Sequence, residues 1–192
     1  MEGGERVAGV LAYTKQGKIQ VRAKITIDAS GDADVVAMAG FDTFIGHEGT
    51  VQNPTMIFRL QSVDLARFLQ AYGADSIMGE EVSETIRRLH AQKKYFLPRA
   101  KIFLFPTPRP NELLCNATRI LGRDGRELNP IYVQDITEAE IEGRRQVREY
   151  ARFIRSHLAG CEKSFVNDTG VQVGVRQSRQ VKGVKTLANE EM

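Results

Sequence analysis

The stretch AKITIDASGDADVVAMAG, residues 23–40, decides the fold. It begins with an apolar run typical of a strand, passes through the small and acidic residues SGDAD at 30–34, and ends in a short helical pattern that stops at Gly40. Ligands of α/β proteins bind at the carboxyl ends of strands. The turn is therefore a candidate ligand site, and the alternative is a plain strand-to-helix turn whose polar side chains only cap the helix.

The segments on either side of this stretch predict a mixed α/β (α+β) fold. Residues 6–14 and 19–29 are β-rich and joined by KQGK, which favours a hairpin. The second arm turns apolar around Ile25 and Ile27, so we expect it to enter a sheet that is covered on both faces. Residues 41–54 have a loop-like composition.

The remainder of the chain alternates predicted strands and helices. A capping box formed by Thr137 and Glu140 predicts a long helix over 137–158, with Gly160 placed to end it. Asp64 is a plausible N-cap for a shorter helix. The other expected elements are strands at 55–63 and 171–176, helices at 64–72 and 80–96, and a hairpin within 101–120.

Composition excludes several classes of protein. The net charge is +3 and most charges are interspersed, which argues against a nucleic-acid partner. No window approaches the roughly 18 apolar residues of a membrane span, and the N-terminus lacks the pattern of a secretory signal, so we expect a cytoplasmic protein without a membrane partner. Cys115 and Cys161 are not in C-x-x-C spacing, which predicts buried reduced thiols and neither a metal site nor iron–sulfur ligands in this chain.

Residues 23–40 resemble the strand, turn and helix of FAD-dependent oxidoreductases with the glutathione-reductase-type flavin fold, such as heterodisulfide-reductase-subunit-A-like and fumarate-reductase-like flavoproteins. Three further segments fit the family in the same order: QNPTMIFRL at 52–60, FLFPTPRPNELLCNATRI at 103–120, and TEAEIEGRRQVREYARFIR from 137 on to VQVGVRQSRQVKG at 171–183. The family's Gly-rich G-x-G-x-x-G turn, which holds the FAD pyrophosphate, has no match here. The chain therefore looks like the middle portion of a flavoprotein.

The resemblance implies three domain segments. Residues 1–46 would be the last part of an FAD-binding domain, 47–170 an antiparallel-sheet-and-helix substrate domain, and 171–192 the return toward the FAD domain. Any iron–sulfur cluster would belong to larger relatives only.

The resemblance also implies site residues. Ala29, Ser30, Gly31 and Asp32 would lie against the FAD. Arg176 and Arg179 are the candidate catalytic residues and would hold a substrate carboxylate or contact a flavin oxygen, the alternative being structural ion pairs.

Asn53 and Thr55 are candidate polar contacts for a small-molecule substrate.

The predicted activity is flavin-mediated hydride or electron transfer. Two alternatives stay open: a non-catalytic substrate-domain module, either binding no flavin or completed by another chain, and a mixed α/β domain without a flavin. An unfinished sheet also favours self-association.

Overall fold

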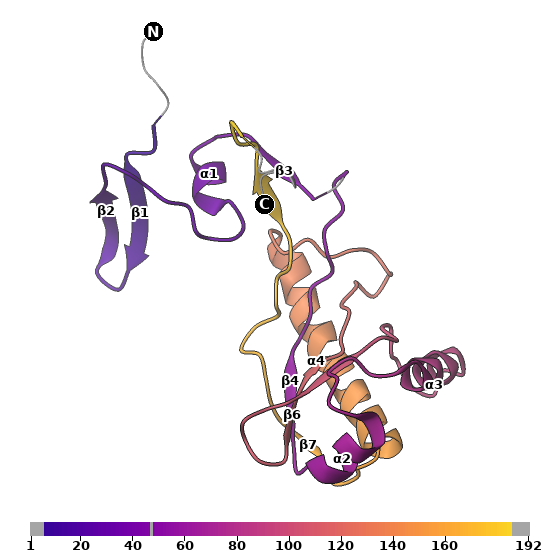
Figure 1. Ribbon diagram of the computed structural model, residues 1–192. Coiled ribbons are helices and arrows are strands. Elements are labelled where there is room, and N and C mark those ends of the chain that lie inside the picture. Colours follow the sequence, from indigo (N-terminus) through magenta and orange to yellow (C-terminus); the bar gives the residue numbers. More distant parts are fainter. Residues whose placement is uncertain (1–5, 47, 186–192) are drawn as a thin grey trace. The chain divides into compact units, whose positions relative to one another are not determined.

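The computed structural model describes residues 6–46 and 48–185, which divide into two compact units. The first unit combines residues up to Thr50 with those from Ser178 onward, and the second comprises Val51–Gln177. Figure 1 shows the elements in chain order. Helices and antiparallel strands occur together, which confirms the predicted mixed α/β class. The assignment of 1–46, 47–170 and 171–192 to functional domains stays a prediction.

The first unit opens with the predicted hairpin. Strands β1 (Gly9–Thr14) and β2 (Gly17–Arg22) pair antiparallel, with Thr14 opposite Gly17. The expected continuation into a covered sheet is wrong, because Ile25 and Ile27 are 80% and 83% exposed. Among the described residues no strand pairs with 23–29, and an extended segment without a partner cannot form a sheet.

The first unit continues with helix α1 (Asp34–Met38), which ends before Gly40 as predicted. Strand β3 (Thr43–Ile45) follows and pairs antiparallel with β8 (Arg179–Val181). The sequence pattern predicted only a loop at residues 41–54. Three residues are too short for a periodic signal, so this strand is defined by its distant partner.

The second unit is built on a four-stranded antiparallel sheet in the order β5-β6-β4-β7. Its strands are β4 (Phe58–Gln61), β5 (Phe103–Pro106), β6 (Glu112–Asn116) and β7 (Phe165–Thr169). The predicted strand at 55–63 and the predicted hairpin within 101–120 are thereby confirmed. The predicted strand at 171–176 forms only an isolated bridge, between Gly174 and Thr55.

Three helices complete the second unit: α2 (Leu65–Tyr72), α3 (Glu80–Ala91) and α4 (Val133–His157). Asp64 caps α2 as predicted, since its carboxylate accepts the amide of Arg67 at 3.1 Å. In the described part of the chain, every helix is too short or too polar to cross a bilayer.

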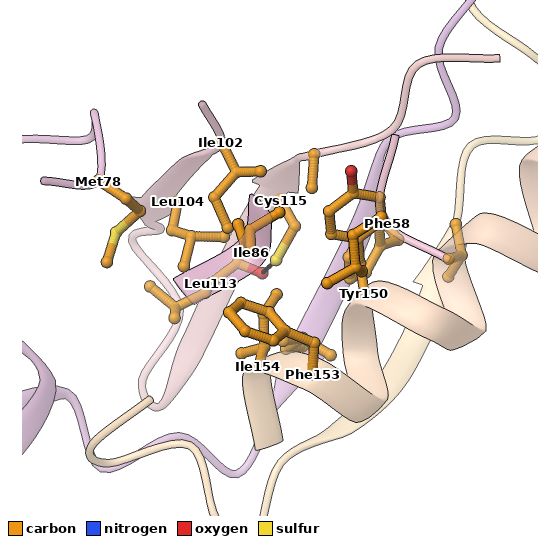
Figure 2. Close-up of a cluster of buried hydrophobic side chains, with 14 of the residues drawn as sticks. Phe58, Met78, Ile86, Ile102, Leu104, Leu113, Cys115, Tyr150, Phe153 and Ile154 are labelled. Carbon is orange, nitrogen blue, oxygen red and sulfur yellow. Dashed lines mark hydrogen bonds between the residues drawn. The ribbon is translucent and has the colours of Figure 1, made fainter. Parts of the chain in front are cut away.

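One hydrophobic core joins α3 and α4 to the sheet (Figure 2). Its fully buried side chains include Ile86 of α3, Tyr150, Phe153 and Ile154 of α4, and Phe58, Leu104, Leu113 and Cys115 of the strands. Burying one such side chain contributes about 1.5–3 kcal/mol. The sheet, α3 and α4 consequently share one core, and the loops of the second unit extend from it.

Helix α4 begins at Val133, one turn before the predicted start, so the predicted capping box is wrong. The hydroxyl of Thr137 donates to the carbonyl of Val133 at 2.7 Å. The carboxylate of Glu140 accepts the amide of Val173 at 2.5 Å. The Thr137 side chain is thus bonded within α4 and that of Glu140 to a distant segment, so neither caps the start of the helix.

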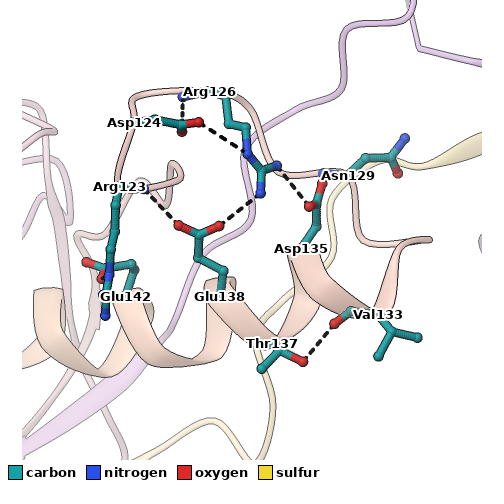
Figure 3. A network of polar contacts seen from close by, with 9 residues as sticks. All are labelled: Arg123, Asp124, Arg126, Asn129, Val133, Asp135, Thr137, Glu138 and Glu142. Atoms are coloured by element: carbon teal, nitrogen blue, oxygen red, sulfur yellow. Dashed lines mark hydrogen bonds and ion pairs between the residues drawn. The ribbon is translucent and has the colours of Figure 1, made fainter.

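Acidic residues of the first turns of α4 bind the preceding loop instead (Figure 3). Asp135 accepts the amide of Asn129 and a guanidinium N–H of Arg126, both at 2.8 Å, while Glu138 accepts from Arg126 at 2.9 Å. Negative charge in this position also complements the helix dipole. The loop of residues 123–129 is therefore tied to α4 by charge.

Candidate functional site

A cavity of about 590 Å³ opens in the second unit between the loops that flank the sheet. Polar and cationic side chains dominate its lining: Gln52, Asn53, Thr55, Arg99, Asn116, Thr118, Arg119, Glu127 and Arg176, with Val51 and Phe103 as the apolar members. The volume suits a small molecule.

Three arginines bring their charge to this cavity. Arg99, Arg119 and Arg176 all line it, and within the described residues none of them forms an ion pair. Burial lowers the pKa of Arg99 below its usual range, and the positive charges of Arg176 and Arg119 lower it further. The cavity therefore has an excess of positive charge, since three arginines line it and the exposed Glu127 is its one acidic lining residue among those that the structure describes.

The head group of Arg99 is held by two neighbours. Its Nη1 donates to Oδ1 of Asn116 at 2.9 Å, and its guanidinium carbon lies 4.8 Å from the ring centroid of Phe103. Arginine stacks on aromatic faces while its remaining N–H groups stay available. This arrangement orients the guanidinium without neutralising it.

The bridge between Thr55 and Gly174 brings two distant segments together at the cavity. Thr55 N–H donates to Gly174 O at 3.1 Å, and Gly174 N–H donates to Thr55 O at 2.7 Å. Arg176 thereby lies on the same cavity as Asn53 and Thr55. The Oδ1 atom of Asn53 is buried and has no partner among the described residues.

Three of the residues suggested by the sequence thus share one cavity, and sequence reasoning missed several others. Arg99 and Asn116 carried no motif. Arg119 directly follows LLCNAT, and that segment alone does not indicate whether the side chain points into a cleft or to solvent. Only the packing of the loops against the sheet shows that these side chains meet.

The turn after residue 28 in the first unit is held by its own side chains. Asp28 accepts hydrogen bonds from the amide and hydroxyl of Ser30, at 3.0 and 2.7 Å, and from the amide of Val36 at 3.1 Å. Ser30 Oγ in turn accepts the amide of Asp34 at 2.9 Å. These hydrogen bonds lower the pKa of Asp28, with those from Ser30 as the largest cause. No local motif marks Asp28, yet its carboxylate binds both sides of the turn.

Ser178 and Arg179, which belong to the first unit, also bind this turn. The hydroxyl of Ser178 donates to Asp32, and the guanidinium of Arg179 pairs with Asp34. Arg179 therefore lies in the first unit, whereas Arg176 lies on the cavity of the second. The two arginines that the sequence suggested together have different surroundings.

The cysteines take no part in either site. Cys115 and Cys161 are free thiols and fully buried, as predicted. Burial raises the pKa of both thiols, that of Cys161 to about 12. Among residues 6–46 and 48–185, no group of histidine, cysteine and carboxylate side chains has the arrangement of a metal site.

The sequence model of the FAD dependent oxidoreductase family matches residues 1–192. The chain therefore belongs to this family of flavin-dependent redox proteins. Comparison with curated proteins and with solved structures gave no significant match.

FAD is the cofactor that the family implies, and the turn after residue 28 fits part of it. Gly31 has a φ of +80°, and a Cβ at this position would meet no atom within 4 Å. A residue without a side chain in open space lets a cofactor pass close to the backbone. The side chains of Ser30 and Asp32 are engaged within the unit, so backbone groups would make the contact.

The pyrophosphate part of the cofactor has no matching residues in this chain. The pyrophosphate is held in such folds by G-x-G-x-x-G, which the 192 residues do not contain. The cofactor-binding role of Ala29, Ser30, Gly31 and Asp32 stays a prediction.

Proposed function

We propose that this chain serves an FAD-dependent oxidoreductase that acts on a small anionic molecule, and that the arginine-lined cavity binds this substrate. The observation that carries the proposal is the gathering of Arg99, Arg119 and Arg176 around one cavity without an ion pair among the described residues. Guanidinium groups keep their charge at all ordinary pH values. Their mutual repulsion makes an anionic ligand the natural complement of the cavity.

The chemistry of the lining favours a carboxylate or phosphate. The guanidinium fork pairs with such groups through two parallel N–H···O bonds. Arg99 is already oriented by Asn116 and Phe103, so it loses little freedom when a ligand binds. Three cations around one cavity, of which Arg99 is held in place, favour a ligand with concentrated negative charge.

The neutral residues of the cavity would orient the remainder of the substrate. Asn53 has a buried amide oxygen that finds no partner in the described part of the chain, and this oxygen can accept a hydrogen bond from a ligand hydroxyl or amine. Thr55 is fixed through its backbone by Gly174 and faces the same cavity. Phe103 adds an apolar surface for carbon atoms of the ligand.

When bound, FAD supplies the two-electron redox chemistry, and the protein supplies binding and orientation. In this scheme Arg99, Arg119 and Arg176 bind the anionic group, hold it in one orientation and displace water from it. Arg176 is the residue of this set for which the sequence had already suggested a substrate contact.

A binding experiment tests the proposal. Malonate, lactate and inorganic phosphate are titrated into the purified chain by calorimetry, with malonamide and lactamide as uncharged counterparts. We expect the anions to bind and the amides to bind at least about 10-fold more weakly, because a hydrogen bond to a charged group is worth about 1.5–3 kcal/mol.

Two variants sharpen the test. Arg176→Gln removes a guanidinium from the cavity, whereas Arg148→Gln removes an equally charged group from the exposed face of α4. Anion affinity should fall about 10-fold in the first and stay unchanged in the second. Equal binding of anions and amides, or equal loss in both variants, would refute the proposal.

A further inference from the structure

Helix α4 carries two buried polar side chains one turn apart. Gln146 is 1% exposed and Tyr150 is 0% exposed. Burying an amide or a phenol costs free energy unless its polar atoms find partners. Residues four apart lie on the same face of a helix, so the two side chains leave α4 in the same direction. Both side chains therefore need hydrogen-bonding partners inside the protein.

Tyr150 binds the main chain of Arg99. Its ring lies in the core among Phe153 and Ile154 (Figure 2). Its hydroxyl accepts the amide N–H of Arg99 at 2.8 Å and donates to the carbonyl of the same residue at 2.7 Å. A side chain that satisfies both polar groups of one residue fixes the position of that residue's Cα.

Gln146 binds the main chain of Arg119 in the same way. Its Oε1 accepts the amide N–H of Arg119 at 3.0 Å, and its Nε2 donates to the carbonyl of Arg119 at 2.9 Å. Gln146 and Tyr150 of α4 thus bind Arg119 and Arg99, which are far apart in the sequence. Both arginines line the cavity.

We propose that Gln146 and Tyr150 are positioning residues for the anion site, and that α4 sets the separation of the Arg99 and Arg119 guanidiniums through them. This rests on the proposed function. Neither side chain lines the cavity, so each acts through the arginine whose backbone it holds. The segments that carry Arg99 and Arg119 lie outside the strands, so side chains of α4, and not a strand ladder, bind the backbone groups of these two arginines.

Removal of the Tyr150 hydroxyl provides the first test. Tyr150→Phe keeps the ring in the core but leaves the N–H and C=O of Arg99 without their partner. The matched control is Tyr72→Phe, which removes a hydroxyl that accepts the amide of Ala159 at 3.0 Å, away from the cavity. We expect malonate affinity to fall about 3- to 10-fold in Tyr150→Phe and to stay unchanged in Tyr72→Phe.

Gln146→Met provides a second variant with a similar side-chain shape. Its control is Gln61→Met, because Gln61 also donates to loop carbonyls, those of Pro110 and Asn111, outside the cavity. The same loss of malonate affinity is expected for Gln146→Met only. If Tyr150→Phe does not fold, Gln146→Met carries the test.

Amide hydrogen exchange separates positioning from general destabilisation. The amides of Arg99 and Arg119 should be protected in the wild type, and each should exchange faster only in the variant that removes its own partner. Malonamide affinity should stay at its wild-type value in both variants, since positioning acts on the charged groups.

The outcomes distinguish the two proposals. Absence of anion binding by the wild type would refute the proposed function. Wild-type anion binding that is retained in full by both Tyr150→Phe and Gln146→Met, with faster exchange of the arginine amides, would refute the positioning role alone.

Discussion

The guanidinium of Arg179 forms an ion pair with the carboxylate of Asp34, although 145 positions of the sequence separate the two residues. This pair joins β8 to the start of α1 inside the first unit. Arg176, three positions earlier, lines the cavity of the second unit and forms no such pair among the described residues. One arginine is therefore structural by its contacts, and the other is available to a ligand.

Arg179→Gln should accordingly destabilise the first unit and leave anion binding unchanged. The side chains of Arg179 and Asp34 are 22% and 41% exposed, so we expect a loss of about 1 kcal/mol after solvent screening. Urea unfolding, followed through the amides of β8, measures the loss. A change in malonate affinity as large as that of Arg176→Gln would contradict this division of roles.

FAD binding should depend on Gly31 more than on a comparable glycine of the same unit. Gly31→Ala and Gly40→Ala both place alanine at a positive φ in open space, so each costs about 1–2 kcal/mol of backbone strain. Only Gly31 lies in the turn predicted to contact the cofactor. Quenching of flavin fluorescence should report weaker FAD binding for Gly31→Ala than for Gly40→Ala, and equal affinities would remove Gly31 from the site.

The turn should loosen in acid because of Asp28. Its hydrogen bonds lower its pKa in the folded protein below the ordinary value of 3.8. A carboxyl with a depressed folded pKa stabilises the fold above its unfolded pKa, and this contribution is lost as the pH falls through the folded pKa. Carbon NMR should show Asp28 titrating below 3.8, and amides of α1 should lose protection in the same range. In Asp28→Asn this acid-dependent step should disappear.

Gly160 should tolerate no side chain. Its φ is +81°, and a Cβ would lie 2.5 Å from the carbonyl oxygen of Asp64 and 2.9 Å from the amide nitrogen of Phe68. Gly160→Ala should therefore cost about 2–4 kcal/mol, from strain and from the clash together. Gly125→Ala is the control, since its φ of +83° is similar but its Cβ would meet nothing within 4 Å. Thermal unfolding of both variants compares the two costs.

Both thiols should be inert in the folded protein. Burial raises the pKa of Cys115 and Cys161, so neither forms the reactive thiolate at neutral pH. A colorimetric thiol reagent should titrate both cysteines rapidly in guanidinium chloride and neither in native buffer. Rapid reaction of one thiol in native buffer would show local opening of the core.

Local signals predicted the elements that depend on local chemistry. The hairpin β1–β2, the Asp64 cap and the end of α1 before Gly40 follow from turn and cap residues that act within a few positions. The start of α4 was misplaced because Thr137 and Glu140 match a capping box in sequence while their side chains bind Val133 and Val173. The distant partner of Glu140 cannot be recognised from the residues next to it in the sequence.

The same distinction applies to the candidate site. Arg176, Asn53 and Thr55 came from the family resemblance, and the structure brings them to one cavity. Arg99 escaped notice because nothing in its neighbourhood carries a motif, and its backbone binds a hydroxyl from the distant helix α4. Sequence patterns report periodicity and turns, whereas a cavity is a product of how separated loops pack.

Because Gln146 and Tyr150 are four residues apart, they stand about 6 Å apart along the axis of α4, and in the proposed scheme this rise sets where the backbones of Arg99 and Arg119 are held. A helix cannot be stretched by a fraction of a turn. Exchange of neutral residues around the cavity would thus alter which polar groups face a ligand, while the two points on α4 that hold the backbones of Arg99 and Arg119 would remain about one turn apart. In this protein the axial rise of the α-helix would then limit the size of the ligands that can contact both arginines.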